Sequence, residues 1–505
     1  MRHTPLIYAL FFVAFAQSAS PCRAQLDWLP SIPQGDATVR LKRWGPDFDG
    51  LLGDHQTPTD LAMPTDSTGR LFVAMQLGKV RIIDAQRNLL PVFLDTANEN
   101  TPDQPHFFTS IAFHKQFAVA GKPGYGKFYT IEVENADTAP ADFGDSLKTR
   151  PDGFQQVIYE YTMNDANATL FEGTKREVIR FDRSGDSSGH NVGDLAFDRA
   201  GYLYIANGDG GNDPNTGDEV AISDNAQYLG NVYGKILRID PIAPELKPTS
   251  KDPVSANGKY RVPRTNPFNE SPASGVDKSV DEIYAYGMRN PYRLNVDLTN
   301  NELYVGSVGQ ANIEAVYRVT PGANLGWNFK EGSFIFDRFD QHNLTADVDS
   351  DGDGLLDFSA SHGLTDPLFE YDHQDGVAVL GGFVYRGKQL PQLYGKYVFA
   401  DFAGGKGVLQ GRLLYGDLAT GEVFEMQLSP ESSPLPPFVY TVGQDRRGEL
   451  YVAGTTADGA YGSIFRLVPP RVTVASGTRT VPESSSAVLM AIAATSAGIW
   501  WKRRR

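Results

Sequence analysis

The sequence predicts an all-β protein, a six-bladed β-propeller of four-stranded blades. One short pattern, a turn glycine or asparagine followed by a β-rich strand, recurs six times between residues 69 and 467. Glycine and proline are plentiful, with 51 and 32 residues, and no long amphipathic helical pattern stands out between residues 25 and 480. Strands joined by many turns are therefore expected, and one closed ring of blades can absorb several hundred residues.

The six copies share a turn residue and a strand that is rich in aromatic and aliphatic side chains. They lie at residues 69–74 (GRLFVA), 126–131 (GKFYTI), 201–206 (GYLYIA), 302–306 (ELYVG), 395–400 (GKYVFA) and 448–453 (GELYVA). In four copies a second strand follows, at 78–83, 234–239, 316–319 and 462–467. Internal repetition of this kind indicates a radial or linear array of β-units. A ring of five or seven blades stays open as an alternative if one unit is degenerate.

Residues 1–24 are expected to be a signal peptide rather than part of the fold. Arg2 precedes an apolar run at residues 6–16, and Cys22-Arg23-Ala24 offers a cleavage site before Gln25. Cys22 is the only cysteine, so the exported chain would have neither a disulfide nor a cysteine-ligated metal. We expect residues 25–54 to lead into a propeller at 55–468, with a linker at 469–480. A lipid anchor on Cys22 is the less favoured alternative.

Residues 481–505 form a second terminal module. Val481-Pro482-Glu483 is followed by an apolar stretch at about 487–501 and by Lys502-Arg503-Arg504-Arg505. This order resembles the PEP-CTERM sorting signal, with Ser484 where that signal usually repeats proline. The resemblance implies transient contact with the membrane, because the apolar stretch is shorter than the roughly 20 residues of a stable span. An ordinary C-terminal anchor is the alternative.

The formal net charge is −15 at pH 7, and both terminal modules are net basic, so the remainder is more acidic still. An acidic surface argues against nucleic acid or anionic lipid as a partner of the folded part. It suits calcium and neutral ligands such as sugars or other polyols.

An ordered series of motifs lies between residues 189 and 387. Its members are 189–195 (GHNVGDL), 208–211 (GDGG), 234–238 (GKILR), 266–268 (NPF), 286–291 (YGMRNP), 308–310 (VGQ) with Glu314, 322–327 (GANLGW) with 331–332 (EG), 371–373 (YDH) and 381–387 (GGFVYRG). The series resembles the glucose/sorbosone dehydrogenase family over about residues 55–468. That resemblance implies an exported quinoprotein that oxidises a sugar with pyrroloquinoline quinone and calcium, the electron acceptor being unknown.

The resemblance assigns roles to the residues that match the family's motifs. His190 matches the general base that takes the hydroxyl proton from the sugar while hydride leaves for the quinone. Asp209 would accept a hydrogen bond from the substrate. Arg289 and Asn290 match positions that face the cofactor, whose carboxylates suit the planar guanidinium, and Lys406 stands near an expected cofactor lysine. Purely structural turn or corner roles are the alternatives for His190, Asp209 and Arg289.

Gly309 and Gln310 match the segment whose backbone carbonyls bind the catalytic calcium in the family. One departure concerns residues 437–442 (PFVYTV), where quinone-using members carry two arginines and this sequence has none. The alternative function is therefore a non-catalytic propeller that binds carbohydrate or protein at the cell surface. A calcium-dependent hydrolase or lactonase on the same architecture ranks third.

A further metal motif does not depend on the family resemblance. Residues 349–357 (DSDGDGLLD) place carboxylates at loop positions 1, 3, 5 and 9, with glycine at position 6; these are Asp349, Asp351, Asp353 and Asp357. Such spacing curls carboxylates around one hard cation and predicts a calcium loop within an insertion at about 345–360. Position 12 is Ala360 instead of the usual glutamate, so modest affinity is expected. An acidic turn without a metal is the alternative.

Overall fold

The computed structural model describes residues 27–46, 57–96, 108–135, 138–144, 154–183, 190–211, 224–269, 279–405, 410–457 and 462–471. The chain divides into two compact units, Met1–Pro469 and Pro470–Arg505, and almost all of the described residues belong to the first. The expected signal peptide (1–24) and sorting segment (481–505) lie outside the described residues. Within the described ranges, none of the helices has the length and hydropathy needed to span a bilayer.

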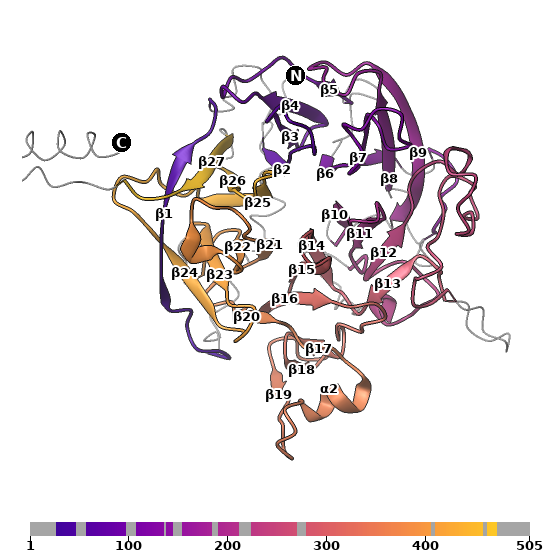
Figure 1. Cartoon of the computed structure of the whole chain (residues 1–505). Coiled ribbons are helices and arrows are strands. Elements are labelled where there is room, and N and C mark those ends of the chain that lie inside the picture. The colour runs from indigo at the N-terminus through magenta and orange to yellow at the C-terminus, as the bar shows by residue number, and fades with distance from the viewer. Residues whose placement is uncertain are drawn as a thin grey trace, which may run out of the picture. The chain divides into compact units, whose positions relative to one another are not determined.

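The described residues form an all-β architecture, as predicted, and four of its sheets have four antiparallel strands each (Figure 1). The first two sheets are β2 (Pro58–Ala62), β3 (Leu71–Met75), β4 (Lys79–Ile83), β5 (Leu94–Asp95); and β6 (Phe108–Phe113), β7 (Lys127–Asn135), β8 (Phe154–Met163), β9 (Gly173–Arg183). The next two are β10 (Val192–Phe197), β11 (Leu203–Asn207), β12 (Lys235–Ile239), β13 (Ile283–Tyr286); and β14 (Asn290–Asp297), β15 (Glu302–Val308), β16 (Ile313–Val319), β20 (Phe369–Asp372).

A larger sheet of eight strands joins the C-terminal part of the propeller region to a strand from near its beginning. It runs in the order β21 (Val379–Val384), β22 (Tyr397–Asp401), β23 (Arg412–Gly416), β24 (Val423–Leu428), β1 (Gln34–Arg43), β27 (Gly462–Val468), β26 (Leu450–Thr455), β25 (Phe438–Gln444). Strand β1 pairs in parallel with β24 and antiparallel with β27. The residues before the expected propeller therefore supply a strand that ties its two ends together.

The first strands of the successive four-strand runs face a common centre. Strands β2, β6, β10, β14, β21 and β25 contact one another in this order, and β25 contacts β2 again (Figure 1). This cyclic neighbourhood of inner strands is the arrangement of a β-propeller. It gathers the loops at one edge of all the sheets around the same centre.

The repeated pattern of the sequence corresponds to the second strand of each run. Its turn residues lie in the left-handed region that favours glycine, with φ of 70° at Gly69, 88° at Gly201 and 83° at Gly395. In the fourth copy the turn residue is Asn301, with φ of 68°. Asparagine is one of the few residues with a side chain that tolerates this conformation. The glycine-or-asparagine signal thus marks the tight turns between inner and second strands.

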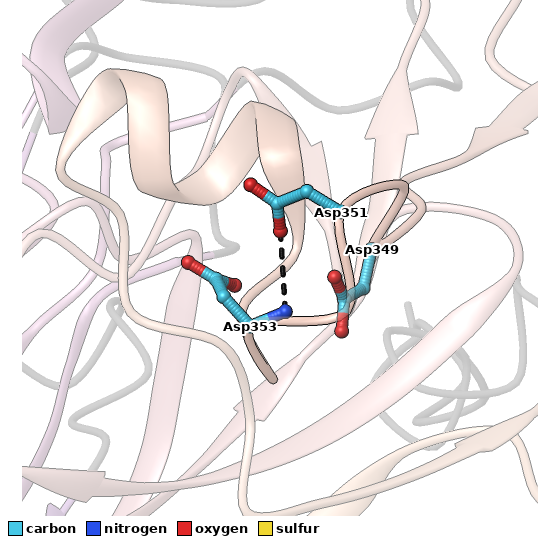
Figure 2. Close-up of side chains that lie close together, drawn as sticks. All are labelled: Asp349, Asp351 and Asp353. Carbon is cyan, nitrogen blue, oxygen red and sulfur yellow. Dashed lines mark hydrogen bonds between the residues drawn. The ribbon is translucent and has the colours of Figure 1, made fainter.

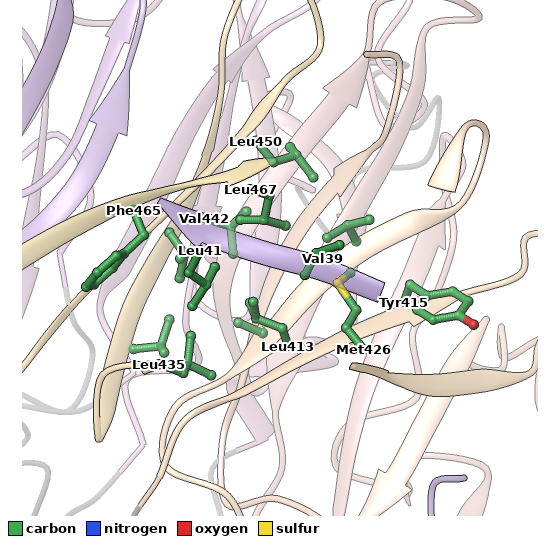
Figure 3. Packing of buried hydrophobic residues seen from close by; sticks show 14 of the residues in the cluster. Val39, Leu41, Leu413, Tyr415, Met426, Leu435, Val442, Leu450, Phe465 and Leu467 are labelled. Atoms are coloured by element: carbon green, nitrogen blue, oxygen red, sulfur yellow. The ribbon is translucent and has the colours of Figure 1, made fainter. Parts of the chain in front are cut away.

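Strand β1 is held by apolar packing on one face. Its burial alternates along the strand, and Ala37, Val39 and Leu41 are buried while their neighbours are more exposed. Figure 3 shows Val39 and Leu41 among side chains from β23 to β27, including Leu413 and Leu467. Burial of each of these aliphatic side chains contributes about 1.5–3 kcal/mol. Packing, and not only backbone pairing, therefore secures the closure.

An insertion between β16 and β20 stands outside the four-stranded sheet (Figure 1). It comprises β17 (Lys330–Glu331), β18 (Phe334–Phe336), β19 (Leu344–Ala346) and the short helix α2 (Asp357–His362). The buried Lys330 Nζ donates to Asp347 Oδ2 at 2.9 Å, to Ser359 Oγ at 2.5 Å and to Asp366 Oδ1 at 2.5 Å. The ammonium group of Lys330 thus connects β17 to α2 and to Asp347, which lies just before the acidic loop of residues 349–357. Three short 3₁₀ helices, Asp224–Ala226, Pro244–Leu246 and Pro391–Leu393, lie in other connections.

Candidate functional site

The expected site residues lie at one edge of two neighbouring sheets. In an antiparallel pair the start of one strand lies beside the end of the next, so His190, before β10, lies near Asp209, after β11. Arg289, before β14, likewise lies near Gln310, after β15. The backbone N–H of Asp209 donates to the carbonyl of Arg289 at 2.9 Å, which joins the two sheets at this edge.

His190 and Asp209 form a buried polar pair. His190 Nδ1 lies 2.6 Å from Asp209 Oδ1, and the indole N–H of Trp327 donates to Asp209 Oδ2 at 2.8 Å. Burial alone would raise the pKa of Asp209, but His190, Arg289 and Trp327 together hold it below its usual value. Because the carboxylate is ionised, it accepts a hydrogen bond from the Nδ1–H of the imidazole, and in the neutral form of His190 the unprotonated nitrogen is then Nε2.

Two glycines of this edge allow the backbone to approach the histidine. A Cβ on Gly208 would lie 2.2 Å from the carbonyl oxygen of His190, and one on Gly211 would lie 2.3 Å from His190 Nδ1. His190 itself adopts a φ of 54°, which few residues with side chains adopt. The Gly-Asp-Gly-Gly motif is therefore required by close packing around His190, and such backbone strain is typical of functional positions.

Arg289 is buried beside the ring of Trp327. Its Nε donates to Gln310 Oε1 at 2.8 Å and its Nη1 to the Val308 carbonyl at 3.2 Å. The guanidinium carbon lies 5.7 Å from the centre of the Trp327 ring. Burial lowers the pKa of Arg289, and the nearby carboxylates of Asp209, Glu331 and Glu314 act against this. Arginine stays charged in such an environment. Trp327 thus contacts both the carboxylate that pairs with His190 and a fixed cation.

The loop after β15 is held by a buried carboxylate that the sequence analysis left without a role. Glu331 Oε1 accepts hydrogen bonds from four consecutive backbone N–H groups, those of residues 310–313, at 2.7–3.1 Å. Gln310 Nε2 also donates to Gln341 Oε1 at 2.7 Å, and Gln341 belongs to the insertion. The Gln310 amide is therefore oriented from both sides, between Arg289 and Gln341. A small cavity of about 20 Å³, lined by Arg289, Trp327 and Glu331 among others, has room for roughly one water.

The remaining expected residues divide into those that join this edge and those that do not. Asn290 begins β14, is half-buried, and pairs with Val308 in the β14–β15 ladder. Gly309 lies in the loop held by Glu331, and its N–H donates to Glu314 Oε1 at 3.2 Å. Lys406 lies outside the described residues. Both oxygens of Asp209 accept hydrogen bonds from the protein, and its expected role as a substrate contact stays a prediction.

The stretch in which quinone-using relatives carry arginines is aromatic here. Phe438 and Tyr440 lie on β25, and their rings are centred 5.1 Å and 5.4 Å from the ring of Phe402. Phe402 itself follows β22. These three side chains form one aromatic cluster at the place where the resemblance leads one to expect charged donors.

The acidic loop of the insertion brings three of its four aspartates together. Figure 2 shows Asp349, Asp351 and Asp353 side by side on the loop, and one oxygen from each lies within 4.8 Å of the others. All three are exposed. Asp357 is not part of this group; it begins α2 and accepts the hydroxyl of Ser350 at 2.5 Å. The same carboxylates also accept N–H groups of the loop, Asp349 from Gly352 and Gly354.

Fold, site edge and motif order agree with one class of protein, and comparison with known proteins gives its family. The chain belongs to the glucose/sorbosone dehydrogenase family, whose model matches residues 55–460. The HIPL2 protein of Arabidopsis thaliana is 28% identical over 462 residues, covering 80% of this chain and 60% of that protein. The human Hedgehog-interacting protein is 26% identical over 426 residues, covering 80% of this chain and 50% of that protein. The chain thus spans about half to three fifths of these relatives.

Solved structures of sugar dehydrogenases share the fold. The soluble aldose sugar dehydrogenase of Escherichia coli, in its apo form, superposes with a TM-score of 0.58 at 18% identity, covering 86% of this chain and all of that one. The aldose sugar dehydrogenase of Streptomyces coelicolor in its PQQ-bound form gives a TM-score of 0.50 at 18% identity, covering 86% of this chain and 99% of that one. At such identities the likeness shows the fold alone.

Proposed function

We propose that this protein is an exported sugar dehydrogenase. It removes the proton of an aldose hydroxyl and a hydride from the carbon that bears this hydroxyl. The observation that carries the proposal is the buried His190–Asp209–Trp327 arrangement beside the fixed cation Arg289. The family match and the sugar dehydrogenases that share the fold support it. The fold part of the proposal is a six-bladed propeller, with the eight-stranded sheet counted as two blades joined through β1.

His190 would act as the general base. Its Nε2 takes the proton of the anomeric hydroxyl, and the ionised Asp209 stabilises the imidazolium that forms and keeps Nδ1 protonated. Trp327 holds the second oxygen of Asp209, so the carboxylate cannot rotate away from the imidazole. A bound quinone supplies the acceptor for the hydride that leaves the same carbon, which converts the aldose to a lactone.

Some of the residues at this edge fit a quinone that carries carboxylates, and others do not. Arg289 is buried, charged and oriented by Gln310, which fits a carboxylate or quinone oxygen. We propose that Arg289, Asn290 and Lys406 hold pyrroloquinoline quinone, and that the carbonyls of Gly309 and Gln310 hold the catalytic calcium. Tyr440, the partly exposed member of the aromatic cluster, would contact the ring system by stacking, while Phe402 and Phe438 are buried in the core behind it.

Steady-state dye reduction tests this function. The purified protein, loaded with Ca²⁺ and pyrroloquinoline quinone, is assayed with a panel of aldoses and an artificial electron acceptor. Aldose-dependent dye reduction that requires the quinone is the expected result. Sugar binding by calorimetry without any dye reduction would instead support the second candidate below.

The second candidate is a propeller that binds a carbohydrate or a protein without turnover. The aromatic cluster in place of the two arginines favours it, since it removes two charged contacts to a tricarboxylate. The Hedgehog-interacting protein among the relatives, named for an interaction rather than a reaction, favours it as well. In this case His190 and Asp209 would orient a ligand and carry out no chemistry.

We also propose that the acidic loop of the insertion binds one Ca²⁺ through Asp349, Asp351 and Asp353. Clustered carboxylates on a glycine-containing loop are the ligands that calcium prefers. Calorimetric titration of Ca²⁺ should therefore lose one binding event in the Asp351→Ala, Asp353→Ala double variant. The matched control is Asp340→Ala, which removes an acidic residue of the same insertion outside the cluster. Equal calcium stoichiometry in the double variant and the parent would refute this site.

Export and sorting complete the proposal. We propose that residues 1–24 direct export and that residues 481–505 are removed after transient membrane contact. Intact mass measurement of the mature, cell-associated protein should give a species without Trp501 and Arg505. A mature species that retains both residues would show a lasting anchor and refute the processing step.

A further inference from the structure

Every inner strand of the ring carries an irregularity at the same place. The pairing register of each first strand with its second strand shifts by one residue near its start, a β-bulge, in β2, β6, β10, β14, β21 and β25. In five of these strands the first residue paired after the bulge is Asp60, Asp194, Arg293, Gly381 or Thr441. In β6 the residue just before the first one paired after the bulge is Ser110. Five of these six equivalent positions carry a charged or polar side chain, and Gly381 is the exception.

Four of these residues form one buried network that joins different sheets. Ser110 Oγ lies 2.9 Å from Asp60 Oδ2 and 2.7 Å from Asp194 Oδ1. Arg293 donates from Nη1 to the carbonyls of Gly193 at 3.0 Å and Thr109 at 3.3 Å, and from Nη2 to the carbonyl of Thr59. Ser110 is fully buried, and Asp60, Asp194 and Arg293 are each 8% exposed or less. The network therefore bonds strands β2, β6, β10 and β14 across the centre of the ring.

The serine contacts require a proton that ionised carboxylates do not have. A hydroxyl carries one hydrogen, so Ser110 can donate to only one of the two carboxyl oxygens. The other contact is a hydrogen bond only if a carboxyl group donates to Ser110. We infer that the folded protein holds one proton in this network, on Asp194, in the chain Asp194 O–H to Ser110 O–H to the Asp60 carboxylate.

The neighbours of each carboxyl group decide which one holds the proton. Asp60 accepts the N–H of Leu61 at 2.7 Å on Oδ1 and the N–H of Ile111 at 2.9 Å on Oδ2, in addition to Ser110. All of its described partners can donate, so both of its oxygens serve as acceptors. Asp194 accepts only the N–H of Leu294, at 3.0 Å on Oδ2, besides the Ser110 contact on Oδ1 and the more distant Arg293 at 3.5 Å.

The charges that face Asp194 agree with this assignment. Burial, together with the charge of Asp60, raises the pKa of Asp194 to about 7, against the lowering influence of Arg293. Tyr292 on β14 and Tyr397 on β22 also face the network, and burial raises the pKa of both hydroxyls, so they stay neutral. With Asp194 protonated, the negative Asp60 and the positive Arg293 balance, and the buried network has no net charge.

Because of this proton, the contribution of the network to folding stability depends on pH. The pKa of Asp194 is higher in the folded chain than in the unfolded chain, so the contribution to stability is complete below the unfolded pKa, near 4. It declines as the pH rises and is lost once the pH passes the folded pKa of about 7. Above that pH, two carboxylates face a single hydroxyl hydrogen, and the hydrogen bond between Ser110 on β6 and Asp194 on β10 is lost. Because β10 begins two residues after His190, loss of this hydrogen bond would affect the strand next to the candidate base.

Two isosteric substitutions in the full chain test the inference. Asp194→Asn places an NH₂ group where the carboxyl proton would be and keeps an acceptor for Leu294. The thermal midpoint of this variant should match the parent at about pH 5 and exceed it by roughly 3 °C or more at about pH 8. Asp60→Asn instead turns an NH₂ group toward backbone donors and should lower the midpoint at both pH values.

Equal behaviour of the two variants, or an Asp194→Asn profile parallel to that of the parent, would overturn the inference. The parent offers an independent readout that does not depend on a variant folding. Difference infrared spectroscopy should show the carbonyl stretch of a buried protonated carboxyl that disappears as the pH rises through about 7. Absence of this band at about pH 5, where ordinary carboxyl groups are already ionised, would likewise overturn the inference. Neither readout depends on the proposed dehydrogenase function.

Discussion

Replacing His190 by alanine should lower aldose turnover by roughly 10² to 10⁴, the usual contribution of a positioned general base. The substitution removes the nitrogen that accepts the hydroxyl proton and leaves Asp209 bonded to Trp327 at 2.8 Å. Binding of the quinone should change little, because the proposed quinone contacts come from Arg289 and the loop after β15, and Gln310 orients Arg289 independently of His190. Rates at saturating sugar and quinone, with the quinone Kd measured separately, check both parts of the expectation.

His362 provides the matched control. It is an exposed histidine on α2, where its ring stacks on Phe358 at 4.0 Å between ring centres. His362→Ala should keep the parent's turnover. A parent that reduces dye as fast as its His190→Ala variant would show that the base is another residue, even though the enzyme would remain a dehydrogenase.

Replacing Arg289 by alanine should weaken quinone binding by about 10- to 100-fold, as expected for the loss of a charge-assisted hydrogen bond of 1.5–3 kcal/mol. The guanidinium is already oriented by Gln310 and by the Val308 carbonyl, so little ordering is required when it meets a carboxylate. Turnover should recover in part when the quinone is in excess. A titration of dye reduction against quinone concentration, at saturating aldose, measures this shift.

Arg318→Ala is the control for a lost arginine, since Arg318 is half-exposed on β16 and pairs only loosely with Glu302 at 3.8 Å. It should leave the quinone titration unchanged. An Arg289→Ala variant with an unaltered quinone Kd but a low rate at every concentration would place Arg289 in the chemistry of the substrate. An unaltered Kd and rate would remove it from the site.

The second strand of each run was predictable because it is encoded locally. A turn glycine or asparagine with a positive φ, followed by alternating β-rich residues, specifies a hairpin within a dozen residues, as at Gly201 and Asn301. Strand β1 escaped prediction for the opposite reason. Its partners β24 and β27 lie about 390 and 425 residues further along the chain, and no local turn points to the pairing. Long-range closure of the ring is visible only once the fold is built.

The candidate site shows the same division. His190, Asp209 and Arg289 could be found because they match motifs of the family, and antiparallel pairing brings these positions together because they border strand ends. The partner role of Asp209 could not be predicted, because the Trp327 indole that holds it comes from a loop 118 residues away. Gln341 gave no sequence signal at all, since its contact with Gln310 depends on how the insertion folds. Lone polar residues of this kind acquire a role only through tertiary contacts.

The most direct test of the central claim is a single-turnover experiment with the purified, calcium-loaded protein carrying pyrroloquinoline quinone. An aldose is added without oxygen or dye, and the absorbance of the bound quinone is followed over time. The account predicts rapid reduction of the quinone by the parent and a rate lower by roughly 10² or more in His190→Ala. A parent that binds the quinone and leaves it oxidised in the presence of every aldose tested would contradict the account.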